Sequence, residues 1–206
     1  MKKIQFRKFI FTSVVSSAMI VGCTHDYDNN IDINSPALRL AESEKLSIPP
    51  AIDLPSNEPN GNTRVATFYA EGVQKYKAKL IAGSTPSQYE WIFVAPRADL
   101  FNVVNAKVGT HSAGPTWQLL GSTTDSIYGQ AFTPAKAAPS SDPGSIDWLQ
   151  LTPKTGKAPT GLFTNVSYIQ RIATNGGKAP LTAPVNATDT IDVPYTAVYR
   201  FTKKNP

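Results

Sequence analysis

The chain has 206 residues, of which 41% are hydrophobic and 17% charged, with one cysteine and two histidines. Its formal net charge is +5, but four of its 20 cations lie within the first eight residues, as Lys2, Lys3, Arg7 and Lys8. The remaining sixteen face fifteen acids, so the rest of the chain is nearly neutral and lacks the basic footprint of a nucleic-acid-binding protein. One cysteine also excludes a disulfide within the chain.

The N-terminus has the pattern of a bacterial export signal. An apolar run over residues 9–21 follows the basic segment, and it is shorter than the roughly 20 residues of a membrane-spanning helix. Ile20, Val21, Gly22 and Cys23 resemble a lipobox, which predicts a signal peptide at residues 1–22 and acylation of the Cys23 thiol and amine, with palmitate among the chains. An ordinary secretory signal or an uncleaved N-terminus is the alternative.

Two or more acyl chains hold a protein stably on a bilayer. We therefore expect the membrane to be a partner and the cell envelope to be the location. Thr24 follows Cys23 and is not the aspartate that retains many enteric lipoproteins at the inner membrane, which favours the outer membrane.

Residues 23–48 are polar and predict a flexible tether, with one short helix over residues 36–45. Acidic and amide residues alternate at Asp26, Asp28, Asn30 and Asp32, as in a calcium loop. The glycine and glutamate of an EF-hand are missing, however, so we expect a solvated tether and no metal.

Residues 49–206 have the length of one domain. Apolar and polar residues alternate with a period of two in several runs, namely residues 73–80, 89–94, 145–151, 162–174 and 193–201. Glycine and proline turns separate these runs. The pattern predicts an all-β, mainly antiparallel fold, either a single β-sandwich or a barrel-like domain with at most one or two short helices. A helical turn is expected within residues 96–107.

Six segments of the domain carry a family resemblance: GVQKY (72–76), WIFVAPRADL (91–100), VGTHSAGPTW (108–117), IDWLQL (146–151), YIQRIATNGGKAP (168–180) and VPYTAVYRF (193–201). In this order they resemble the domain of unknown function 3455 family. The resemblance implies a secreted or envelope-located single domain and supplies no activity. Relatives commonly carry a cysteine near the place of Ala78 and another before VPY. If those cysteines pair, the resemblance implies that residue 78 lies beside residues 181–192.

Any histidine chemistry in the domain depends on His111, which lies in an irregular glycine-rich stretch with Trp117. His111 could act as an acid or base with a carboxylate such as Asp99, Asp125 or Glu71. Alternatively it bonds a backbone carbonyl while Trp117 fills the core. One imidazole and no thiolate are too few for a usual zinc site, and we expect no cofactor.

Three further residues are candidates for ligand binding. Gln170 lies on an apolar strand face, where it either lines a pocket or bonds backbone groups, because a buried amide needs partners. Arg171 faces the other side, with an acid such as Glu90 or Asp99 as its expected partner. Trp91 is an aromatic surface on which a glycan could stack, or a core residue.

These observations favour a non-catalytic ligand-binding or structural module of the envelope. Its expected partners are a small molecule, a glycan or an envelope protein, and not nucleic acid. An envelope hydrolase that uses His111 is the alternative, and metal storage or transport is a third class.

Overall fold

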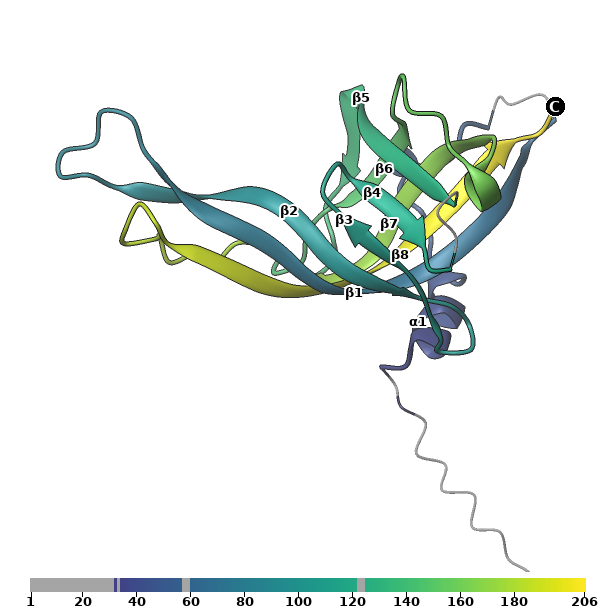
Figure 1. Ribbon diagram of the computed structural model, residues 1–206, viewed down its shortest axis with the longest axis horizontal. Helices are drawn as coiled ribbons and strands as arrows, with labels where there is room; N and C mark the ends of the chain where they lie inside the picture. Colours follow the sequence, from purple (N-terminus) through teal and green to yellow (C-terminus); the bar gives the residue numbers. More distant parts are fainter. Residues whose placement is uncertain (1–31, 33, 57–59, 122–124) are drawn as a thin grey trace, which may run out of the picture. The chain divides into compact units, whose positions relative to one another are not determined.

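A computed structural model of the protein describes residues 32, 34–56, 60–121 and 125–206 (Figure 1). Asp32–Pro206 form one compact unit. The predicted signal peptide and Cys23 lie outside the described residues, so the predictions made for them stay predictions.

Eight antiparallel strands pair in chain order and close into a barrel, in which β8 pairs with β1. The all-β prediction is confirmed, and of its two alternatives the barrel is the one formed. The strands are β1 (Asn62–Leu80), β2 (Tyr89–Phe101), β3 (Lys107–Ser112), β4 (Thr116–Leu119), β5 (Ser126–Ala138), β6 (Trp148–Pro153), β7 (Val166–Gly176) and β8 (Thr190–Lys204).

Side chains at alternate positions fill the barrel, as a period of two requires. In β8 these are Tyr195, Ala197, Tyr199 and Phe201, all buried in the main core. Phe201 packs against Phe68 of β1, with ring centroids 5.9 Å apart. It also packs against Phe163 of the short 3-10 helix η2 (Gly161–Phe163), at 4.8 Å.

The helical turn expected within residues 96–107 is wrong. Residues 96–101 belong to β2, where Ala98 and Leu100 point into the barrel and are buried. The chain then reverses in a tight turn, in which the Asn102 side-chain oxygen accepts hydrogen bonds from the backbone of Val104 and Ala106. The segment is therefore a strand, held by apolar side chains at alternate positions and not by one face of a helix.

The short helix expected over residues 36–45 is confirmed as α1 (Pro36–Ser43). Together with the 3-10 helix η1 (Pro50–Ile52), it covers part of the outer surface of the barrel. Leu40 and Ile52 pack there against Ile172 and Val198 in a second, smaller core. The compact unit thus begins before the boundary predicted between residues 48 and 49.

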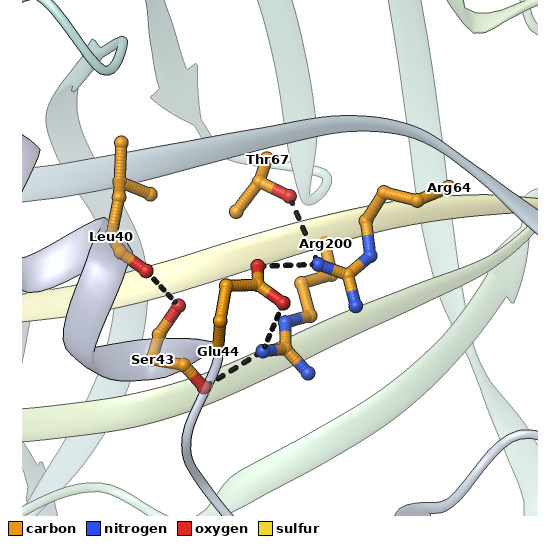
Figure 2. A network of polar contacts seen from close by, with 6 residues as sticks. All are labelled: Leu40, Ser43, Glu44, Arg64, Thr67 and Arg200. Carbon is orange, nitrogen blue, oxygen red and sulfur yellow. Dashed lines mark hydrogen bonds and ion pairs between the residues drawn. The ribbon is translucent and has the colours of Figure 1, made fainter.

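A buried cation attaches this N-terminal segment to the barrel (Figure 2). The Arg200 guanidinium donates to the Ser43 carbonyl oxygen at 2.8 Å and lies 3.3 Å from the Glu44 carboxylate. Arg64 reaches the other oxygen of Glu44 at 2.6 Å. Arg200 is 4% exposed, so losing its partners would leave a charge without solvent or a hydrogen bond.

Three strands continue beyond the barrel as an arm, made of residues 73–80, 89–97 and 190–194 (Figure 1). It has three strands because β3 pairs with β2 only from Ala98 onward. Consequently its apolar residues are not all covered, and Leu80, Phe93 and Val94 are each half exposed. The alternation predicted the strands correctly but could not predict this exposure.

The base of the arm depends on the absence of a side chain at Gly72. A Cβ atom at this position would overlap the Arg97 carbonyl oxygen and Ala98 of the adjacent strand. Farther out, the Ala78 N–H donates to the Asp189 carbonyl oxygen at 2.8 Å. The neighbourhood that the family resemblance implied for residue 78 and residues 181–192 is thus confirmed.

Candidate functional site

A cavity of about 370 Å³ lies inside the barrel, next to the base of the arm. Each of the eight strands contributes to its wall. The first four strands provide Gln74, Phe93, His111 and Trp117. The last four provide Ala131, Leu149, Arg171 and Tyr199. The cavity is therefore a product of barrel closure.

Most of the wall is apolar. Leu149 and Leu151 of β6 line one part, and Phe93 and Val94 of β2 line another. The half exposure of Phe93 and Val94 puts apolar surface at the rim as well as inside. An apolar cavity with a few converging polar groups is the usual form of a small-molecule site.

His111, Trp117 and Tyr199 form an aromatic stack at the cavity wall. The rings of His111 and Trp117 are nearly parallel, with centroids 4.5 Å apart and an angle of 11°. Tyr199 lies 4.9 Å from His111 and 5.2 Å from Trp117. Gly129 of β5 makes room for this stack, because a Cβ atom there would lie 3.0 Å from the Trp117 ring.

The stretch around His111 is regular, contrary to the expectation of an irregular loop. It forms a hairpin of β3 and β4, in which His111 and Trp117 are register partners. The His111 Nδ1–H donates to the Thr116 carbonyl oxygen at 2.9 Å. This is the bond to a backbone carbonyl that was the alternative to an acid or base role for His111. Trp117 is fully buried and also lines the cavity, so a packing role and a site role coincide in it.

His111 is neutral at physiological pH. Burial lowers its pKa to about 4; the bond to Thr116 opposes this shift, and the positive charge of Arg171 adds to it. Because a carbonyl oxygen only accepts, the proton resides on Nδ1, and Nε2 is an acceptor. The imidazole thus adds no charge to the cavity wall.

Several polar atoms of the wall have no hydrogen-bond partner among the described residues. They are Gln74 Nε2, Trp117 Nε1 and the Tyr199 hydroxyl, on side chains at most 2% exposed. The Tyr199 hydroxyl does lie beside the Tyr195 hydroxyl and the Arg171 guanidinium, and both influence its pKa. Burial raises the pKa of both tyrosines, so both keep their protons. A buried polar group without a partner costs about 1–3 kcal/mol, unless a water or ligand satisfies it.

Arg171 is the charged residue of the wall. Its Nε and Nη2 donate to the Asp147 carbonyl oxygen at 3.1 and 2.8 Å. No carboxylate lines the cavity, and Arg171 forms no ion pair within the part of the chain that the structure describes. Glu90 and Asp99 were the acids expected to pair with Arg171. Instead, Glu90 pairs with Lys79 and Asp99 with Lys107.

Comparison with protein families gives one match. The model described as "Protein of unknown function (DUF3455)" matches residues 59–203. The chain belongs to this family. The match runs from before β1 to near the end of β8, and so includes every strand of the cavity wall. No curated protein and no solved structure matches the chain.

Within the DUF3455 domain, the structure brings together three of the predicted site residues, His111, Trp117 and Arg171. It separates the other two from them. Gln170 lies on the outer surface of the barrel, where its Nε2 donates to the Ile52 carbonyl oxygen at 2.8 Å. Trp91 lies on the arm, and its Nε1 donates to the Thr182 carbonyl oxygen at 2.9 Å.

The carboxylates considered as partners of His111 are placed elsewhere in the DUF3455 domain. Asp99 pairs with Lys107 at 2.8 Å, and Asp125 accepts a hydrogen bond from the Leu162 N–H at 3.2 Å. Glu71 lies exposed beside Gly72, away from the cavity wall. None of these three carboxylates therefore lies where it could pair with His111 as a catalytic base.

Sequence reasoning missed two of the wall residues, Gln74 and Tyr199. Both follow the alternation that places their neighbours inside the barrel, after Phe68 and Ala70 in β1 and after Tyr195 and Ala197 in β8. A polar side chain on an otherwise apolar strand face was the available signal.

Among the described residues, no three or more histidine, cysteine or acidic side chains are grouped to hold a metal ion. No helix in the described ranges is long and apolar enough to cross a membrane.

Proposed function

We propose that the barrel cavity binds a small, largely apolar molecule, and that the protein is a non-catalytic lipoprotein of the bacterial cell envelope anchored through acylated Cys23. The observation that carries the binding function is the cavity of about 370 Å³ to which all eight strands contribute. Eight-stranded barrels have interiors large enough to hold one small ligand.

The composition of the wall supports a ligand more than a catalytic role. Leu149, Leu151 and Phe93 supply apolar contact area, and Gln74, Arg171 and Tyr199 add a few polar side chains to the same wall. Binding in such a cavity removes apolar surface of both the wall and the ligand from water, which is favourable. His111 has a backbone carbonyl as its hydrogen-bond partner, which suits a positioning role in the wall.

The sequence before the domain supports the anchor. A basic start, an apolar run and the lipobox-like residues that end at Cys23 have the order of a lipoprotein signal. Acyl chains on Cys23 give the protein the membrane as its partner, and Thr24 favours the outer membrane as its location.

The first prediction concerns the cavity. We expect 4-phenylbutyrate or its neutral amide, 4-phenylbutyramide, to bind the full chain with 1:1 stoichiometry in isothermal titration calorimetry. The lipidated protein is kept in dodecyl maltoside, with the same micelles in the syringe. Ala131→Phe places a larger side chain at the cavity wall and is expected to weaken binding at least about tenfold.

Ala135→Phe is the matched control, because Ala135 is also exposed on β5 but does not line the cavity. This variant is expected to bind as the wild type does. No binding of either compound to the wild type, or equal weakening by the two substitutions, would contradict ligand binding in the barrel.

A second prediction concerns the anchor. Natively produced protein is expected to enter the detergent phase in a phase-partition experiment, with acyl groups on residue 23 in its mass spectrum. Cys23→Ser is expected to move the protein to the aqueous phase, since hydroxyl oxygen does not replace the thiol in lipid transfer. A bare thiol at residue 23 of the native protein would rule the anchor out.

A further inference from the structure

We infer that the ligand of the barrel cavity carries one carboxylate group, which Arg171 binds. This inference rests on the proposed binding function and adds the chemical class of the ligand. Its basis is the position of one positive charge in a largely apolar cavity that none of the described acids lines.

The first argument is charge. Arg171 lines the cavity. Its positive charge acts to lower the pKa values of the buried His111 and Tyr199. Among the residues that the structure describes, no other charged side chain lines the cavity, since His111 is neutral. A monoanion inside would therefore neutralise the wall, whereas a phosphate dianion would leave an excess negative charge in an apolar space.

The second argument is the set of hydrogen-bond donors. The bonds of Arg171 to the Asp147 carbonyl oxygen use Nε and Nη2 and fix the plane of the guanidinium, which also interacts with Tyr199. Gln74, Trp117 and Tyr199 also line the cavity, and each of these side chains carries a hydrogen-bond donor. A carboxylate is an acceptor with two oxygens and matches such a set.

The third argument is that these groups are contiguous. Arg171 and Tyr199 are register partners on the adjacent strands β7 and β8. Tyr199 in turn contacts Trp117, with ring centroids 5.2 Å apart. Arg171 thus lies between two register partners that also line the cavity, Tyr199 of β8 and Leu149 of β6, so the charge is beside both a polar and an apolar side chain.

The inference is tested with the matched pair of compounds, 4-phenylbutyrate and 4-phenylbutyramide, which differ in charge but hardly in shape. At pH 7.5 we expect the full chain to bind the carboxylate at least about tenfold more tightly than the amide, because charge-assisted bonds are the stronger. Arg171→Met is expected to abolish this preference, because it weakens binding of the carboxylate far more than binding of the amide, and Arg171→Lys is expected to retain part of it.

Arg97→Met is the control, because Arg97 lies on the arm, is exposed and pairs with Asp192. It is expected to keep the wild-type preference. Binding of the amide as tightly as the carboxylate in the wild type would overturn the inference and leave the proposed function standing. The failure of both compounds to bind would instead remove the proposed function. The wild-type comparison decides the inference even if Arg171→Met does not fold.

Discussion

Replacing Trp117 with alanine is expected to lower the free energy of unfolding by about 3–5 kcal/mol, the usual range for truncating a buried tryptophan. Trp117 is fully buried and is held between the His111 ring at 4.5 Å and Phe201 at 5.6 Å. Its removal leaves a void that joins the existing cavity, because one side of Trp117 already lines it. The barrel can close this void only by moving strands that are paired on both sides.

The measurement is urea unfolding of the full chain, with the change in stability taken from the midpoint at an unchanged slope. Trp91→Ala is the matched control. Trp91 lies on the arm, only partly buried, and makes one hydrogen bond to the Thr182 carbonyl oxygen. We expect this variant to lose less than about 2 kcal/mol. Equal losses for the two substitutions would mean that the barrel core does not depend on Trp117.

The second large effect is a loss of stability in mild acid. The pKa of His111 is about 4 in the folded protein, against an ordinary value of 6.5. Between these values the unfolded chain binds a proton that the folded protein does not, so protonation favours unfolding. The contribution of neutral His111 is complete above pH 6.5 and is lost as the pH falls toward 4. The size of the shift corresponds to roughly 3 kcal/mol.

Unfolding free energies at a series of pH values between 7.5 and 4 would measure this effect in the wild type and in His111→Phe. The variant keeps an aromatic ring against Trp117 but cannot titrate, so its stability is expected to stay nearly level across this range. Asp142 and Asp189 affect the two proteins alike. Hydrogen bonds from Ser145 and from the Asn186 backbone, respectively, lower the pKa values of these carboxyls in the folded protein, so both proteins lose the same stabilisation at the acid end of the range. Parallel curves for the two proteins would show that His111 is not the titrating group.

The same shift has a consequence for the cavity. While His111 is neutral, Arg171 is the charged group of the wall, and the wall is complementary to a monoanion. Burial of His111 keeps its imidazole neutral, and the cavity wall therefore carries the single positive charge of Arg171.

The sequence by itself determined the fold class and part of the site. The alternation in residues 193–201 is the alternation of β8 in the structure, because every second side chain of a strand must face the interior. His111 and Trp117 meet because a hairpin of two short strands brings residues that are close in sequence into register. Local pattern was sufficient where the contact itself is local.

Only the tertiary structure decided which face of each strand is the inner one. In β7 both faces are apolar, because Ile169 packs inside the barrel and Ile172 packs outside against α1 and η1. The alternation therefore predicted that Gln170 and Arg171 lie on opposite faces of the strand. It could not predict that Arg171 lines the cavity and that Gln170 bonds the Ile52 carbonyl oxygen outside the barrel. Barrel closure settled this assignment, together with the exposure of Phe93 on the arm, since both depend on contacts between strands distant in sequence.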